Sequence, residues 1–125
     1  MKLSTVMIIN TVVAVVFGIA FVIVPAQLVS LYGVTADPAL KYMGQLFGAA
    51  LLALALVTWS ARNAPDSDAR NAIALGLFVG YAIGFIVALI GQLNNVVNAL
   101  GWLNVVIYLA LTFGFGYYQF TKRTS

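Results

Sequence analysis

The chain has 125 residues, of which 63% are hydrophobic and 7% are charged, and its formal net charge is +3. A soluble domain carries roughly 25% charged residues, so this composition excludes an ordinary soluble protein and indicates a single transmembrane domain over residues 1–125. The sequence has no histidine, cysteine or glutamate, and its three aspartates lie in predicted loops. We therefore expect no metal site, no cofactor and no enzymatic activity.

Four long apolar runs predict four transmembrane helices, over residues 3–24, 39–61, 69–93 and 100–120. At ~1.5 Å per residue, each run is long enough to cross the ~30 Å hydrocarbon core of a bilayer. The first run is too long for the apolar region of a signal peptide, so we expect it to be retained. The predicted fold is all-α, an integral membrane four-helix bundle.

The first two connections carry helix-terminating and helix-starting residues. Pro25 ends the first span, and the apolar residues 28–32 predict a short helix lying in the membrane interface. Pro38 follows an aspartate at a position that favours a helix start. In the second connection, residues 66–68 are Asp-Ser-Asp, and we expect them to cap the third span and to place negative charge at its first turn.

The second span carries a short small-residue face at Gly44 and Gly48, with Gln45 within about 60° of it. We therefore expect Gln45 to point towards a packed neighbour in the bundle interior. Gln45 and Asn104 of the fourth span are predicted to lie at similar depth, because their helices run in opposite directions. We expect these amides to hydrogen-bond to each other or to backbone carbonyls.

The third span carries small residues at every fourth position. These are Ala72, Gly76, Gly80, Gly84 and Ala88. Small residues let membrane helices approach closely, so this stripe predicts a helix-packing face. Each step rotates it by about 40°, so no single straight neighbour uses all of it. Either one part packs in the bundle while another meets a second partner, or all of it packs inside a compact monomer.

The third connection holds an uncharged polar cluster. Its members are Gln92, Asn94, Asn95 and Asn98. Asparagine tolerates left-handed backbone geometry and bonds to its own chain, which favours a tight turn. The alternative is a contact with a ligand or a partner.

The fourth span carries a polar stripe, because Asn104, Tyr108 and Thr112 fall within an arc of about 80°. Asn10 is a weaker candidate of the same kind on the first span. Neutral polar groups within a membrane most often form hydrogen bonds between helices. The alternative is a polar path or pocket for a small neutral solute.

The basic residues predict the orientation of the chain. Lys2, Arg62, Arg70, Lys122 and Arg123 share one side of a four-span topology, and only Lys41 lies on the other. The positive-inside rule therefore places both termini in the cytoplasm and the protein in the cytoplasmic (inner) membrane. We expect contacts with membrane lipids and none with nucleic acid.

The run "LYGVTADPALKYMGQLFGAALLALAL", the basic loop and "NALGWLNVVIYLAL" resemble an uncharacterised family of small bacterial four-span membrane proteins. The resemblance implies a four-helix membrane protein without an assigned activity, and it carries no catalytic residues.

Two functions remain from the sequence alone. The first is a non-enzymatic accessory or structural subunit that packs against other membrane proteins, or against itself, through small-residue helix faces. The second is a small channel or carrier for an uncharged or apolar molecule, and a related possibility is binding of a lipid, quinone or pigment. The absence of charged residues lining the spans favours the first.

Overall fold

The computed structural model describes residues 2–123, with side chains described as far as Phe120, and this part of the chain is built of helices without strands. The helices are α1 (Leu3–Ile23), α2 (Pro25–Leu31), α3 (Pro38–Ala61), α4 (Asp68–Leu93) and α5 (Gly101–Arg123). Four of them, all except α2, are long and apolar enough to cross a membrane. The all-α class and the four long helices predicted from the sequence are thus confirmed.

The helices begin where the sequence supplies caps. The Asp37 carboxylate accepts a hydrogen bond of 2.8 Å from the backbone N–H of Leu40, and Pro38 is the first residue of α3. The Ser67 hydroxyl accepts one of 3.2 Å from the backbone N–H of Arg70 at the start of α4. These side chains satisfy backbone donors that have no partner within their own helix.

Helix α1 packs against α3 at a point where both helices carry glycine. A Cβ atom on Gly48 would lie 2.7 Å from the backbone oxygen of Gly18, so no side chain fits between the two backbones. One turn earlier on α3, Gly44 lies against the ring of Phe21. The small-residue face predicted on this span therefore packs against α1.

Helix α4 packs against α5 in a second pair, again over glycines. A Cβ atom on Gly84 would lie 2.5 Å from the ring of Tyr108, and one on Gly116 would lie 2.7 Å from the ring of Phe78. Contacts within the pairs α1–α3 and α4–α5 are extensive, whereas those between the pairs are sparse and lie mainly between α1 and α5. The four-helix unit is therefore a pair of helix pairs.

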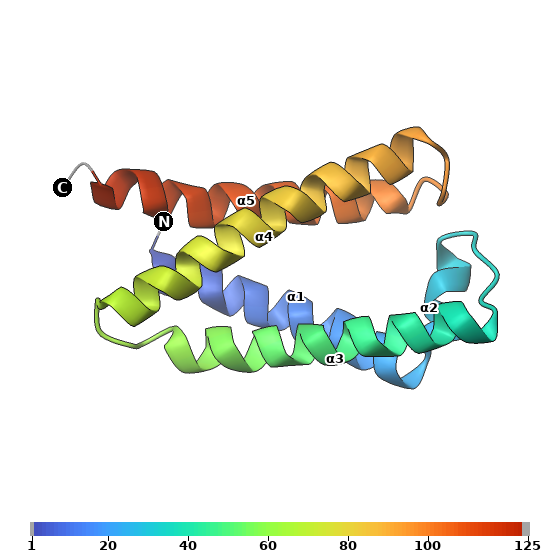
Figure 1. Cartoon of the computed structure of the whole chain (residues 1–125), viewed down its shortest axis with the longest axis horizontal. Helices are drawn as coiled ribbons and strands as arrows, with labels where there is room; N and C mark the ends of the chain where they lie inside the picture. Colours follow the sequence, from blue (N-terminus) through green and yellow to red (C-terminus); the bar gives the residue numbers. More distant parts are fainter. Residues whose placement is uncertain (1, 124–125) are drawn as a thin grey trace.

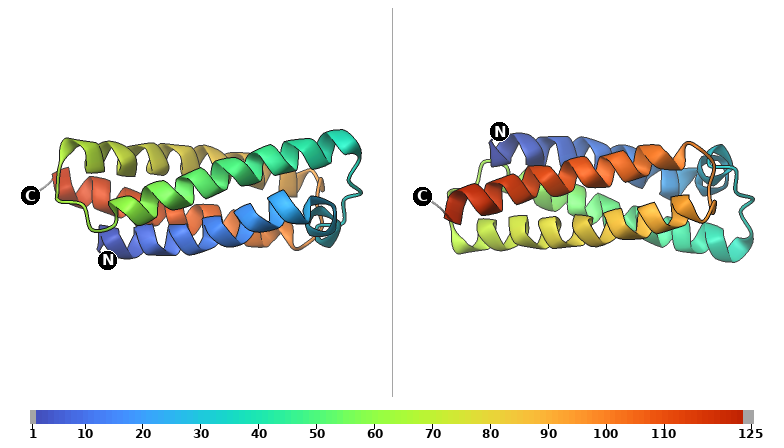
Figure 2. Two further views of the ribbon diagram at one scale, coloured as in Figure 1. Left: turned by 90° about the horizontal axis from the view of Figure 1, so that it is seen from below. Right: turned by 90° about the horizontal axis from the view of Figure 1, so that it is seen from above.

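The two pairs are fastened together at one end of the molecule. Figure 1 shows the start of α1, the end of α5 and the α3–α4 connection at this end, while α2 and the α4–α5 connection lie at the other. Both views of Figure 2 show the same arrangement. A buried apolar cluster fills the space between the pairs near the first end. Its members are Leu3, Val6, Met7, Ala61, Ala74, Leu77, Tyr81, Leu111 and Phe115.

The outer surface of the long helices is apolar. Large side chains such as Val16, Leu56, Val87 and Phe113 are each at least 60% exposed. Such a surface is unfavourable in water and suits the hydrocarbon core of a bilayer.

Candidate binding cleft between the helix pairs

A buried polar network joins α1, α3 and α4 in the half of the bundle that holds the α3–α4 connection. Tyr81 donates its hydroxyl hydrogen to Oδ1 of Asn10, and Nδ2 of Asn10 donates to Oγ1 of Thr58 over 3.2 Å. The hydroxyl oxygens of Thr11 and Thr58 lie 2.8 Å apart. Asn10 and Thr58 are fully buried. The network fixes the orientation of the Tyr81 ring, and this ring lines the cleft described below.

Only Asn10 of this network was predicted from the sequence. Thr58 continues the face of α3 that holds Gly48 and Ala55, since it follows them at helical spacing, and all three are buried. That spacing is a signal by which Thr58 could have been found. Tyr81 belongs to another helix, and nothing in its local sequence marks it as the partner of Asn10.

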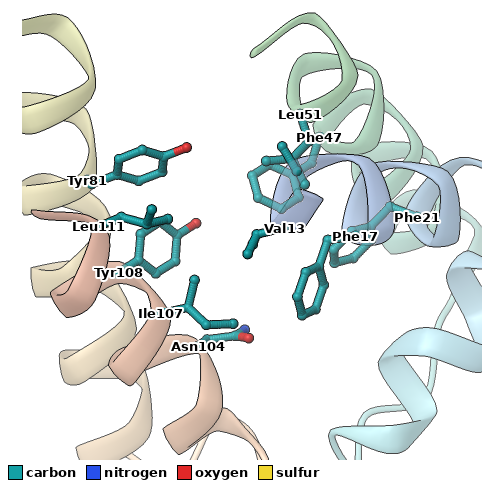
Figure 3. A pocket seen from close by; sticks show the side chains of 11 residues that line it. Val13, Phe17, Phe21, Phe47, Leu51, Tyr81, Asn104, Ile107, Tyr108 and Leu111 are labelled. Carbon is teal, nitrogen blue, oxygen red and sulfur yellow. The ribbon is translucent and has the colours of Figure 1, made fainter. Parts of the chain in front are cut away.

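A cleft with a volume of about 70 Å³ lies between the two helix pairs, beside the Tyr81 ring (Figure 3). The wall from α1 and α3 is made chiefly by Val13, Phe17, Phe21, Phe47 and Leu51. The wall from α4 and α5 is made by Tyr81, Asn104, Ile107, Tyr108 and Leu111. In Figure 3 the two sets of side chains face each other across the gap. None of the lining residues is charged.

Two hydrogen-bond donors in the cleft have no protein acceptor. Among the described residues, the Tyr108 ring packs against Tyr81 and Gly84, and its hydroxyl forms no hydrogen bond. The Asn104 side chain accepts one hydrogen bond through Oδ1, and its Nδ2 donates none. Both groups lie on α5, one turn apart, and Figure 3 shows the Tyr108 hydroxyl pointing into the gap.

At the end of the cleft nearest α2, the end of α2 hydrogen-bonds to the α4–α5 connection and to α5. We name this contact the Tyr32–Asn98 clasp. Tyr32 donates its hydroxyl hydrogen to Oδ1 of Asn104 over 2.8 Å. The backbone N–H of Asn98 donates to the carbonyl of Tyr32 over 2.8 Å, and Nδ2 of Asn98 donates to that of Leu31 over 2.9 Å. Burial raises the pKa of Tyr32, against a smaller lowering by its bond to Asn104, so this hydroxyl stays protonated at neutral pH.

The polar residues of the α4–α5 connection form a turn. Asn95 adopts a left-handed backbone with φ of 58°, and Asn94 is the C-cap of α4. Gln92 is buried and donates from Nε2 to the carbonyl of Asn98 over 3.2 Å. The Asn98 carboxamide also accepts from the backbone N–H of Leu100. This arrangement agrees with the turn interpretation, and Asn98 adds the contact to the α2–α3 connection.

Gln45 points towards its packed neighbour α1 and bonds to a backbone carbonyl there, which is one of the two predicted pairings, but it is exposed rather than in the bundle interior and does not meet Asn104. Its side chain is exposed and donates to the carbonyl of Val22 over 3.2 Å, while Asn104 bonds to Tyr32 instead. The reason is geometric, because the buried face of α3 is centred on its glycines and Gln45 stands at the edge of that contact. Thr112 donates to the carbonyl of Tyr108 over 2.6 Å, within its own helix.

The small-residue stripe of α4 divides into two parts. Gly84 packs against Tyr108 of α5, whereas a Cβ atom on Gly76 or Gly80 would meet nothing within 4 Å among the described residues. Ala72 is also exposed, and Ala88 is half-buried. One part of the stripe therefore packs on α5, and the part around Gly76 and Gly80 faces open space among the described residues.

The comparisons with known proteins give one match. A family model described as a domain of unknown function (DUF8292) matches residues 1–119. No curated protein and no solved structure matches the chain.

Proposed function

Since the chain belongs to the family defined by a domain of unknown function (DUF8292), we propose a role from the cleft itself: binding of a neutral, largely apolar molecule within the membrane. This is the carrier or binding alternative of the sequence analysis. The observation that carries it is the cleft between the helix pairs, which is uncharged and holds two hydrogen-bond donors without an acceptor among the described residues.

The shape and lining of the cleft support a small-molecule site. Ligand sites are concave, mostly apolar and equipped with a few placed polar groups. The cleft has a volume of about 70 Å³, and aromatic side chains stand on both of its walls. A charged ligand would find no counter-charge among the lining residues, so the ligand is neutral.

The protein acts by binding rather than by catalysis. The chain has no histidine, cysteine or glutamate. Its aspartates lie at the helix ends, as Asp37 does when it caps α3. No acid or base therefore stands beside the cleft to activate a nucleophile.

We place the protein in the cytoplasmic membrane with both termini inside. The basic side chains Arg62 and Arg70 lie at the α3–α4 connection, at the same end as Lys2 before α1. Arg70 also donates to the carbonyls of Ala61 and Arg62 at the end of α3 over 3.5 and 3.4 Å. This basic end fits the cytoplasmic face.

A cleft-filling substitution tests the binding role. Val13 lines the cleft, whereas the neighbouring Val12 is exposed on the outer surface of α1. The protein is purified in mild detergent and analysed by native mass spectrometry for bound neutral molecules. We expect a bound mass on the wild type and on Val12→Phe, and its loss from Val13→Phe with the helix content unchanged. Equal binding by both variants, or no bound molecule on the wild type, would contradict the proposal.

A second candidate function is supported by the exposed part of the α4 stripe. Because Gly76 and Gly80 meet nothing within the described chain, this face is open for an accessory-subunit contact or for a second copy. Chemical cross-linking in native membranes tests it with Gly80→Leu, and Val87→Leu on the exposed surface of α4 is the control. Loss of a cross-linked product from Gly80→Leu alone supports the contact, and an unchanged pattern contradicts it.

A further inference from the structure

The cleft and a neighbouring groove share three lining residues, and we infer that together they hold one ligand, a quinone with a long apolar tail. The inference rests on the proposed binding function and names the chemical class of the ligand. The quinone ring lies in the cleft with one ring carbonyl on the Tyr108 hydroxyl. The tail follows the groove between α1 and α5.

The first argument is the kind of hydrogen bond that the cleft offers. Oδ1 of Asn104 already accepts from Tyr32, so the amide presents only its N–H donors to the cleft. Tyr108 adds a hydroxyl, one turn away and without a partner among the described residues. Such a site favours a ligand whose polar atoms are acceptors. A quinone carbonyl has this property, whereas a long-chain alcohol brings a donor as well.

The second argument is the shape of the cleft walls. Phe17 and Phe47 face the ring of Tyr108 from across the gap (Figure 3). Aromatic rings favour offset stacking or edge-to-face contact with another flat ring, at about 0.5–1.5 kcal/mol per pair beyond area burial. A flat quinone ring therefore gains contacts on both walls that a flexible acyl chain does not.

The third argument is that the space continues beyond the cleft. A groove of about 550 Å³ between α1 and α5 shares Val13, Ile107 and Leu111 with the cleft. It continues along α5 to Gly114 and Tyr117. At ~1.5 Å per residue, the stretch from Tyr108 to Tyr117 spans ~13 Å, enough for several carbon atoms of an extended tail.

The depth of the donors fits a ring held inside the hydrocarbon region. Tyr108 follows the start of α5 at Gly101 by seven residues, which places it ~10 Å below that end of the helix. If the acceptor on Tyr108 belonged to a phospholipid, the charged headgroup of that lipid would have to leave the interface and enter the hydrocarbon region. A neutral quinone pays no such desolvation cost.

Decylubiquinone tests the ring contact, with decylbenzene as the matched ligand that lacks carbonyls. The full chain carries Trp59→Phe, so that its remaining tryptophan is Trp102, which precedes the cleft residue Asn104 on α5 by two positions. The protein is placed in phosphatidylcholine nanodiscs. Saturable quenching of Trp102 reports quinone binding, and decylbenzene is measured by competition. We expect Tyr108→Phe to raise the Kd of decylubiquinone about five- to tenfold, and the exposed control Tyr42→Phe to leave it unchanged.

The tail contact has its own pair of variants. Ala110 lines the groove, whereas Val106 is exposed one turn earlier on α5 and lines neither cavity. The comparison ligand is the same dimethoxy-methyl-benzoquinone ring without a tail. We expect Ala110→Phe to raise the Kd of decylubiquinone severalfold and to leave the Kd of the tail-less ring unchanged. We expect Val106→Phe to change neither Kd. Equal weakening of both ligands by Ala110→Phe would overturn the placement of the tail.

The possible failures of the inference and of the binding function are distinct. If decylbenzene binds as tightly as decylubiquinone, or Tyr108→Phe has no effect, the quinone assignment is overturned while a neutral ligand site remains. If neither compound binds saturably to a folded protein, both proposals fall. Quinone binding that depends on Tyr108 and exceeds that of decylbenzene supports both.

Discussion

At the scale of single residues, Thr58 shows how neutral polar groups stabilise a membrane bundle. Its oxygen accepts from Asn10, and its hydroxyl lies 2.9 Å from the carbonyl of Leu54 in its own helix. Because Asn10 also accepts from Tyr81, removal of one hydroxyl disturbs contacts among three helices. In lipid each such bond contributes about 0.6 kcal/mol on average and at most about 1.7.

We predict that Thr58→Val lowers the free energy of unfolding by about 1–2 kcal/mol, since valine keeps the shape but leaves the buried Asn10 amide without its acceptor. The matched control is Thr5→Val, at an exposed position of α1. Unfolding of the detergent-solubilised protein by increasing SDS, followed by circular dichroism, measures the difference. Equal stability of the two variants would show that the network contributes nothing.

Tyr32 gives a prediction that depends on pH, because it closes the clasp as a neutral donor to Asn104. Burial raises its pKa above the ordinary value of 10.0. Its contribution to stability is therefore complete below that value and is lost as the pH rises through the pKa of the folded state. We expect the unfolding temperature of Tyr32→Phe to be lower than that of the wild type at neutral pH and to fall less between neutral and alkaline pH. Parallel pH profiles would contradict this role.

The amide side chains show what the sequence predicts at this scale and what it does not. The polar character of Asn10 and Asn104 within apolar runs marks both as candidates for hydrogen bonds between elements. Their partners Tyr81 and Tyr32 are distant along the chain, and the residues around each asparagine do not indicate which distant side chain it meets. Gln45 bonds to a backbone carbonyl of α1, as the sequence allows, but it is exposed, because a helical wheel gives the angle of a side chain and not the width of the neighbour's contact.

At the scale of the helices, two glycines of the α4 stripe that are one turn apart differ in their surroundings. Gly84 leaves just enough room for the ring of Tyr108, and Gly80 faces open space among the described residues. We predict that Gly84→Leu lowers the stability of the solubilised protein by about 1–3 kcal/mol, because the Tyr108 ring must move. Gly80→Leu should leave it unchanged. The same SDS unfolding measures both, and equal destabilisation would mean that the stripe packs differently.

The elements themselves are largely predictable because their signals are local. The four apolar runs, two of which are bounded by Pro25 and Pro38, place the helix ends within three residues of those observed. Capping residues such as Ser67 act within one turn of the chain, so their roles follow from sequence alone. The division of the α4 stripe does not follow from the sequence, since it depends on how far α5 extends across that face.

At the scale of the whole molecule, the cleft could not be predicted from the sequence, because it arises from the separation of the two helix pairs. Lipid tails are as apolar as the helices, so no hydrophobic force drives the two pairs fully together in a membrane. They meet through the cluster around Phe115 at one end and through the Tyr32–Asn98 clasp at the other. The space between these contacts is a property of the assembly and has no signature in any single helix.

The orientation of the chain in the membrane can be tested by cysteine labelling, because the sequence has no cysteine that would interfere. The α3–α4 connection, with Arg62 and Arg70, should face the cytoplasm, and the α4–α5 connection should face outwards. Asn63→Cys and Asn94→Cys place one thiol in each connection at exposed positions. A membrane-impermeant maleimide should label Asn94→Cys in intact cells and Asn63→Cys only after permeabilisation. The reverse pattern would invert the chain and place the Tyr32–Asn98 clasp, with the donor end of the cleft, on the cytoplasmic side.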